Sequence, residues 1–280
     1  MNERATQEVD LKIDLRHSEP RQTLHPGPVV GPDNGSTTTL SAADMRSLLN
    51  RHLFGTWLSR VVSRRSITNR SPSRTYRFAK RAVDVTVSFL LLVLLIPVLF
   101  ITALAVRFTS RGPIFYRHSR LGVGSTVFKM VKFRSMVDGA DGRLAAMDEL
   151  VRRGEVEALD EVVFKAPDDP RVTRVGRFLR RTNIDEIPQL LNVVAGQMSL
   201  VGPRPLVAKE IETLGDWSKD QRLSARPGVT GLWQVARGEE TTFAERMALD
   251  LLYVEQRSAL LDICLFAMTP IAIVRGARSH

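Results

Sequence analysis

The stretch that decides the fold is residues 83–106, VDVTVSFLLLVLLIPVLFITALAV. From Phe89 to Val106 it runs for 18 residues without a charge, which is the lower limit for a helix that crosses a membrane. Because the run is apolar on every side, a membrane helix explains it better than the core helix of a soluble protein. Pro97 lies in its middle, and a proline there kinks or breaks a helix.

Basic residues flank this run on both sides: Arg77, Lys80 and Arg81 before it, and Arg107, Arg111 and Arg117 after it. Positive charge favours the cytoplasmic side of a membrane, so the two flanks give no clear orientation to a simple span. A helix that enters the membrane, bends at Pro97 and returns to the same face satisfies both flanks. The residues alone leave the re-entrant and the spanning arrangements open.

Residues 1–75 differ in composition from the rest of the chain. Before residue 40 there is no sustained apolar period, and Pro, Gly and Thr are frequent. We therefore expect a largely disordered, basic N-terminal extension, with a helix over residues 41–62 as its one candidate element. Residues 60–81 are rich in Arg and Ser, which favours contact with anionic lipid next to the apolar run.

The overall charge indicates an anionic partner. Lys and Arg total 40 against 30 acidic residues, a formal net charge of +10. Nucleic acid, anionic lipid and a phosphorylated substrate would all fit that excess. Nucleic acid is the weakest of the three, because aromatic residues make up only 6% and no nucleic-acid-binding motif is present. The single cysteine, Cys264, excludes an internal disulfide and a cysteine-rich metal site.

After the apolar run the pattern changes to strands. Residues 114–116 and 127–131 flank a glycine loop, which predicts a β-hairpin. The Gly122-Val123-Gly124 segment is typical of a turn, since a lone Gly-x-Gly is a weak phosphate-binding signal. Residues 132–136 end the hairpin and present Lys132, Arg134 and a serine hydroxyl. A charged helix is expected over residues 138–163.

Residues 182–205, TNIDEIPQLLNVVAGQMSLVGPRP, follow a short basic helix expected over residues 173–181 with Val175, Phe178 and Leu179 inward. Two readings of this segment compete. Asn183 and Glu186 have the spacing of a helix capping box, a purely structural role. Asp185 and Glu186, however, lie among arginines before and after them, which indicates a site for a metal and phosphates.

The C-terminal part adds fewer signals. Residues 226–235 predict a turn followed by a strand, and residues 243–254 predict a helix. The tail, residues 260–274, is apolar except for Asp262 and contains Pro270. It is too short to span a membrane comfortably, so we expect a helix that lies on the membrane or packs on the core.

From residue 76 to its end, the chain resembles the bacterial sugar transferase family, phosphoglycosyltransferases of the membrane-hairpin type that act on polyprenyl phosphate. The segments that carry the resemblance are KRAVD (80–84), the central Pro97, GPIF (112–115), KFRSM (132–136), DPRVT (169–173), DEIPQLLNV (185–193), MSLVGPRP (198–205) and RPGVTG (226–231). Their order and spacing together are highly specific.

The resemblance implies the transfer of a sugar-1-phosphate from a nucleotide diphosphate sugar, usually a UDP-sugar, to polyprenyl phosphate, with release of UMP. It implies Asp185 as the nucleophile and Glu186 as a ligand of Mg²⁺. A carboxylate can hold a phosphosugar covalently and split one transfer into two steps. Candidate phosphate and substrate ligands are Arg180, Arg204, Lys132, Arg134 and Arg226.

The expected fold is α+β and mainly helical: a re-entrant membrane helix-break-helix, residues 76–112, and a small cytosolic catalytic domain, residues 113–280, with a β-hairpin and interfacial amphipathic helices. The resemblance implies the bacterial inner membrane with the active site on its cytoplasmic face. Ile96 departs from the family, where a serine commonly precedes the proline. A homodimer is compatible with these expectations, and the alternative function is a non-catalytic membrane scaffold of polysaccharide assembly.

Overall fold

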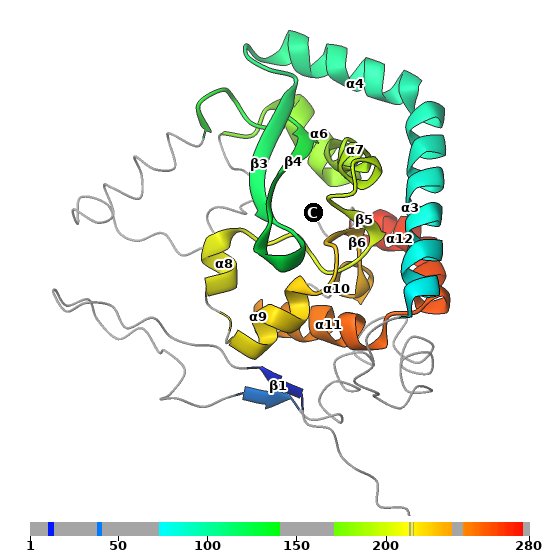
Figure 1. Ribbon diagram of the computed structural model, residues 1–280. Helices are drawn as coiled ribbons and strands as arrows, with labels where there is room; N and C mark the ends of the chain where they lie inside the picture. Colours follow the sequence, from blue (N-terminus) through cyan, green and yellow to red (C-terminus); the bar gives the residue numbers. More distant parts are fainter. Residues whose placement is uncertain are drawn as a thin grey trace, which may run out of the picture. The chain divides into compact units, whose positions relative to one another are not determined.

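The computed structural model describes residues 11–13, 38–40, 73–140, 171–212, 214, 216–236 and 243–276 (Figure 1). The described chain is mainly helical, as expected. It divides into two compact units, one of residues 1–83, 119–128 and 197–269 and one of residues 84–118, 129–196 and 270–280. The helix predicted over residues 41–62 and most of that predicted over 138–163 lie outside the described residues.

The membrane-type run forms two helices, α3 (Arg74–Leu94) and α4 (Ile96–Thr109), separated by Leu95 and bent by 63°. Pro97 lies in the first turn of α4, where its missing N–H is tolerated. No single helix among the described residues is long and apolar enough to cross a membrane, whereas α3 and α4 together meet that test as a bent pair. The predicted break near Pro97 is thus present, and the bent pair fits either a broken span or a re-entrant loop.

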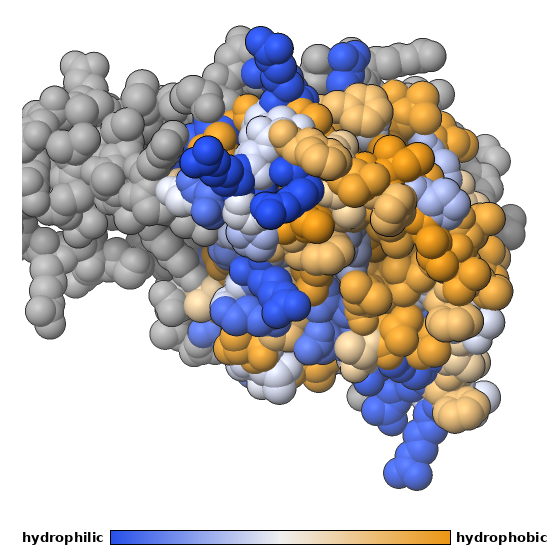
Figure 2. Space-filling view, turned by 90° about the horizontal axis from the view of Figure 1, so that it is seen from above, coloured by the Kyte–Doolittle hydropathy of each residue, from blue (hydrophilic) through white to orange (hydrophobic). Residues whose placement is uncertain are grey.

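One face of α4 packs inward within the second unit. Val106 is buried with Phe133 and Leu179, and Leu99 and Ala103 pack against this cluster from the same side of α4. The remaining faces carry large exposed apolar side chains, among them Phe100, Ile101 and Phe108. When the molecule of Figure 1 is seen from above, apolar residues cover much of the visible surface (Figure 2). Such exposure is unusual for a surface in water and is typical of one that meets lipid.

The predicted hairpin is confirmed. Strands β3 (Phe115–Leu121) and β4 (Val127–Phe133) form a two-stranded sheet, joined by the short 3-10 helix η1 (Val123–Ser125). Gly124 adopts a φ of 61° inside that turn, a conformation glycine reaches without strain. The Gly-x-Gly segment is therefore a turn, and the hairpin delivers residues 132–136 at its end.

The rest of the second unit holds α6 (Arg174–Thr182), η3 (Ile184–Glu186) and α7 (Gln189–Val194). Thr173 caps α6 by accepting a hydrogen bond from the Gly176 N–H at 2.8 Å. Leu179 is buried as expected, but Phe178 is 60% exposed, so its predicted inward position is wrong. With only nine residues, α6 presents a narrow inner face, which Gly176 and Leu179 occupy.

The first unit contains the remaining elements: β1 (Leu11–Ile13) paired antiparallel with β2 (Thr38–Leu40), β5 (Ser199–Val201), α8 (Ala208–Glu212), α9 (Asp216–Leu223), β6 (Gly228–Thr230), α10 (Leu232–Ala236), α11 (Phe243–Gln256) and α12 (Ala259–Gly276), whose last turns belong to the second unit. Helix α11 confirms the prediction for residues 243–254. The prediction of a turn and a strand over residues 226–235 needs a correction: the strand β6 is only three residues long, and the helix α10 follows it.

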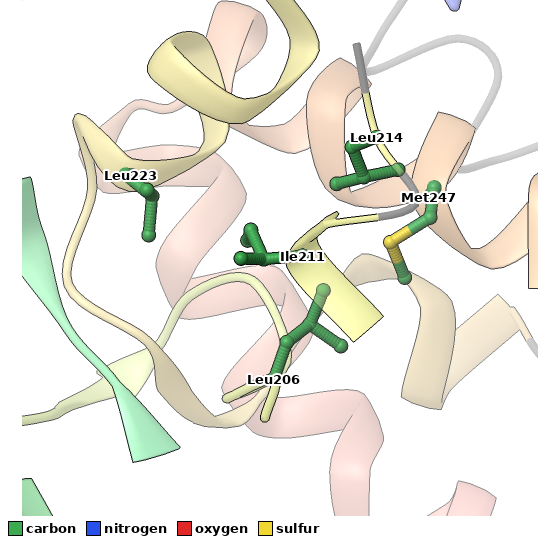
Figure 3. Packing of buried hydrophobic residues seen from close by; sticks show 5 residues of the cluster. All are labelled: Leu206, Ile211, Leu214, Leu223 and Met247. Atoms are coloured by element: carbon green, nitrogen blue, oxygen red, sulfur yellow. The ribbon is translucent and has the colours of Figure 1, made fainter. Parts of the chain in front are cut away.

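A hydrophobic cluster of Leu206, Ile211, Leu214, Leu223 and Met247 holds α8, α9 and α11 together (Figure 3). Strand β5 pairs with β6 in parallel, with Ser199 opposite Gly228. A Cβ on Gly228 would overlap the backbone of Gly202, so the two segments can approach this closely only as glycines. Packing therefore requires the glycine at position 228 of the RPGVTG segment.

Candidate functional site

The two acids that the sequence singles out lie at a junction between helices. Helix α6 ends at Thr182, and Asn183 takes the left-handed conformation, with φ 54° and ψ 19°. Asparagine tolerates that conformation better than most residues. The chain then makes the single 3-10 turn η3, which carries Asp185 and Glu186, and α7 begins only after Pro188.

The capping box predicted from Asn183 and Glu186 is wrong. Asn183 makes no side-chain cap for η3, because its left-handed backbone serves to end α6. The Glu186 side chain instead accepts a hydrogen bond from Lys132 Nζ at 2.6 Å, an ion pair with the end of β4. A cap at Asn183 is thus not what places the acids: the left-handed turn and the pairing with β4 do so.

Asp185 is the more unusual of the two acids. It is 8% exposed, and burial and the neighbouring Glu186 raise the pKa of its carboxyl from 3.8 to about 6. Lys132 and Arg180 act in the opposite direction and lower this pKa. Asp185 is thus a poorly solvated carboxylate with a reactive oxygen, and the two cations beside it can bind the anionic oxygens of a ligand.

A buried asparagine docks α7 on the hairpin. The Asn192 amide donates to the Lys129 carbonyl at 2.8 Å and accepts from the Val131 N–H at 2.9 Å. This is the pairing that a neighbouring strand would make, so the amide fixes the position of α7 along β4. Lys132 follows directly in β4, where it meets Glu186. Sequence reasoning overlooked Asn192, although a polar residue on the apolar face of a short helix was a usable signal.

Arg134 was expected to bind phosphate, but the structure places its guanidinium elsewhere. Arg134 is 6% exposed and donates from Nη2 to the carbonyl and the hydroxyl of Ser110, at 2.8 and 2.9 Å. Ser110 is the C-cap of α4, so Arg134 compensates the negative end of that helix. It is also absent from the cations that lower the pKa of Asp185.

Arg204 and Arg226 belong to the other compact unit. The backbone of Arg204 is held on both sides: its N–H donates to Asp250 Oδ2 at 3.0 Å, and its carbonyl accepts from Arg222. Arg222 also pairs with Asp250 at 2.6 Å, and both are almost fully buried. This buried pair was missed in the sequence, where Asp250 is a lone charge within an apolar stretch of α11.

The side chain of Arg204 lies over the ring of Trp233, with its guanidinium carbon 5.3 Å from the ring centroid. An arginine stacked on an aromatic ring keeps its donors directed outward in one plane, which suits bidentate binding of phosphate. Arg226 is exposed at the start of the tight glycine segment. The structure thus brings Lys132, Arg180 and the two acids together in one unit, and holds the backbone of Arg204 in the other.

A divalent metal was expected at Glu186. Among the described residues there is no group of three or more His, Cys, Asp or Glu that would form a closed metal site. Mg²⁺ does not need one, since it commonly uses one or two carboxylates and takes its remaining ligands from water and substrate phosphates. The carboxylate of Glu186, which also pairs with Lys132, fits that mode of binding.

The comparisons with known proteins agree on one family. The sequence profile described as bacterial sugar transferase matches residues 75–276. The exopolysaccharide production protein ExoY of Sinorhizobium fredii is 40% identical over 204 residues, 72% of this chain and 88% of the relative.

Two further relatives carry more specific names. The undecaprenyl-phosphate galactose phosphotransferase of Salmonella typhimurium is 38% identical over 75% of this chain and 43% of its own length. The UDP-glucose:undecaprenyl-phosphate glucose-1-phosphate transferase of Klebsiella pneumoniae is 38% identical over 68% of this chain and 39% of its own length. The chain thus spans less than half the length of these two relatives and most of the length of ExoY.

Proposed function

The chain belongs to the bacterial sugar transferase family, and we propose that it transfers a hexose-1-phosphate from a UDP-sugar to undecaprenyl or another polyprenyl phosphate, with release of UMP. The observation that carries this proposal is the buried Asp185 carboxyl, whose pKa is raised to about 6 while Lys132 and Arg180 face it. The relatives named for galactose and for glucose transfer are equally similar to the chain, at 38% identity. We therefore propose a hexose donor and leave its identity to a substrate panel.

In the proposed reaction an Asp185 oxygen attacks the phosphorus that carries the sugar. The bond from that phosphorus to the oxygen bridging the two phosphates breaks, and UMP leaves with the electron pair. In the second step an oxygen of polyprenyl phosphate attacks the same phosphorus, and the bond to Asp185 breaks. Two displacements of this kind divide one difficult transfer into two easier ones.

The surrounding residues position and neutralise phosphate oxygens, which is most of what phosphoryl transfer requires of a protein. Lys132 and Arg180 both lie near enough to Asp185 to lower the pKa of its carboxyl. Arg204, which is held by its backbone and stacked on Trp233, is our candidate for the nucleotide diphosphate. When bound at Glu186, Mg²⁺ would supply additional positive charge to the phosphates.

We propose further that α3 and α4 enter the membrane and return to its cytoplasmic face. The 63° bend at Leu95, the exposed apolar side chains of α4 and the basic residues at both ends support this arrangement. Polyprenyl phosphate keeps its charged head at the interface, while a nucleotide sugar is dissolved in the cytosol. An enzyme anchored in one leaflet would give both substrates access to the same carboxylate.

A turnover assay tests the function. We expect purified protein to release more than one equivalent of UMP from UDP-galactose or UDP-glucose only when both polyprenyl phosphate and Mg²⁺ are present. Asp185→Asn should abolish release, and Asp220→Asn, which removes an exposed acid from α9, should leave it unchanged. Full activity of Asp185→Asn would refute its role as nucleophile, and a phosphosugar trapped on Asp185 would support the covalent route.

Labelling tests the topology. In a Cys264→Ser background, Arg77→Cys and Arg111→Cys mark exposed positions at the two ends of the bent pair. A re-entrant pair predicts that a membrane-impermeant thiol reagent reaches both positions from the cytoplasmic side. Labelling of the two positions from opposite sides would show a spanning arrangement instead.

A further inference from the structure

Ser135, the second residue after β4, contacts α6 and its cap at three points. Its carbonyl accepts a hydrogen bond from the Thr173 N–H at 3.0 Å, at the residue that caps the helix. Its hydroxyl accepts from Arg180 Nε at 2.8 Å, in the last turn of the helix. Between these two contacts, Gly176 lies so close that a Cβ there would overlap the Ser135 carbonyl.

These contacts place both ends of α6 on a single residue. Thr173, Gly176 and Arg180 are separated by three and four positions, so they lie on the same face of the helix. The absence of a side chain at Gly176 lets the helix axis approach the strand end closely. Ser135 itself is only 9% exposed, so water does not compete strongly for its hydroxyl.

The contact to Arg180 has a specific geometric effect. A guanidinium is planar, and a hydrogen bond at Nε, nearest the flexible stem, fixes the orientation of that plane. The Nη1–Nη2 edge is then the one that can take a phosphate bidentately. The Ser135 hydroxyl thus contributes to the orientation in which Arg180 presents that edge.

We propose that Ser135 is a positioning residue for sugar-phosphate transfer: its hydroxyl orients the guanidinium of Arg180 toward the phosphate of the sugar donor. This inference rests on the proposed function and adds a residue to it. Ser135 does not touch the reacting atoms in this proposal. It acts through Arg180, and its backbone contacts with Thr173 and Gly176 are the scaffold that makes this possible.

The test is a double-mutant cycle on Ser135 and Arg180 with the full-length protein. Ser135→Ala removes the hydroxyl and keeps the carbonyl contacts, so α6 should stay docked. Hydrogen bonds to charged groups correspond to roughly 10- to 100-fold in an equilibrium or rate, so we expect kcat/KM for the UDP-sugar to fall by that order. Arg180→Ala should lower kcat/KM by at least as much, with the loss divided between kcat and KM in the same way as in Ser135→Ala.

In the Arg180→Ala background, Ser135→Ala should have no further effect on kcat or KM. The matched control is Ser218→Ala on α9, which also deletes a fully buried hydroxyl, one without a hydrogen-bond partner among the described residues. This control should leave the kinetics unchanged.

Four results would overturn the inference. Wild-type kinetics in Ser135→Ala, with Asp185→Asn inactive, would remove the positioning role and leave the proposed function intact. Additive losses in the double mutant, or a loss of activity in Ser135→Ala that only follows the loss of folded protein in a melting assay, would show a purely structural role. A wild-type protein that releases no UMP from any UDP-sugar would instead refute the proposed function, and the inference with it.

Discussion

Replacing the proposed nucleophile should make the protein more stable. Asp185 is 8% exposed, and burial is the largest cause that raises the pKa of its carboxyl from 3.8 to about 6. A folded-state pKa above the unfolded value means that folding favours the protonated acid. The ionised acid therefore opposes folding, and Asp185→Asn removes that charge while keeping the shape of the side chain.

The pH window and the size of the effect follow from this difference. Below pH 3.8 the carboxyl is protonated in both states and costs nothing. The cost grows as the pH rises from 3.8, and above the folded-state pKa of about 6 it is fully present. A difference of about two pH units corresponds to about 3 kcal/mol in the free energy of unfolding. For a chain of this size, that is roughly 6–12 °C in melting temperature.

The assay is thermal unfolding of the wild type and Asp185→Asn in the same detergent, with EDTA to exclude any effect of bound metal. We expect the variant to melt higher at about pH 8, and the two proteins to differ by less than about 1 kcal/mol at about pH 4. Asp220→Asn removes the same charge from an exposed position and should change neither value. Equal melting temperatures of wild type and Asp185→Asn at the higher pH would refute the reasoning, as would a stabilisation that persists unchanged at the lower one.

Three further results are expected. The transfer rate should fall as the pH drops through about 6, because the protonated Asp185 cannot attack. Since Lys132 lowers the pKa of this acid, Lys132→Met should move the midpoint of the pH–rate profile to higher pH. The pH–rate profiles of both proteins measure this shift, and an unmoved midpoint would count against Asp185 as the titrating nucleophile. Asp250→Asn leaves the buried Arg222 without its counter-charge and should cost about 3–5 kcal/mol in urea unfolding, whereas a loss below about 1 kcal/mol would show that the pair is not needed for folding. Gly176→Ala forces a Cβ against the Ser135 carbonyl, so it should lower the free energy of unfolding by about 1–3 kcal/mol and reduce the transfer rate. A variant with wild-type stability and activity would show that α6 can move away freely.

The sequence predicted those elements whose signals are local. The break near Pro97 follows from the covalent structure of proline, and the hairpin follows from two apolar segments around a glycine turn. Helix α11 was equally clear from its apolar spacing. In each case neighbouring residues contain enough information, because the element forms in much the same way wherever it packs.

The errors arose where tertiary contacts decide. The Asn183 spacing satisfies a capping box, but the left-handed conformation that ends α6 uses the same residue for a different purpose. Arg134 has the charge of a phosphate ligand, and the sequence does not reveal that its Nη2 donates to Ser110 at the end of α4, a contact between residues 24 positions apart. Ser135 was noted only as a hydroxyl at the end of the hairpin and Asn192 was overlooked, since the role of a hydroxyl or an amide depends on partners that the sequence does not show.

The same contacts connect the membrane helix to the acids through very few residues. Consecutive residues of a strand point to opposite faces, so in β4 Phe133 joins the buried cluster with Val106 of α4 while its neighbour Lys132 pairs with Glu186. On α6, Leu179 belongs to that same cluster, and the adjacent Arg180 lowers the pKa of Asp185. Both cations of the site are thus one residue away from side chains that pack on the helix proposed to enter the membrane. A shift of α4 against this cluster would move both cations relative to the carboxylates.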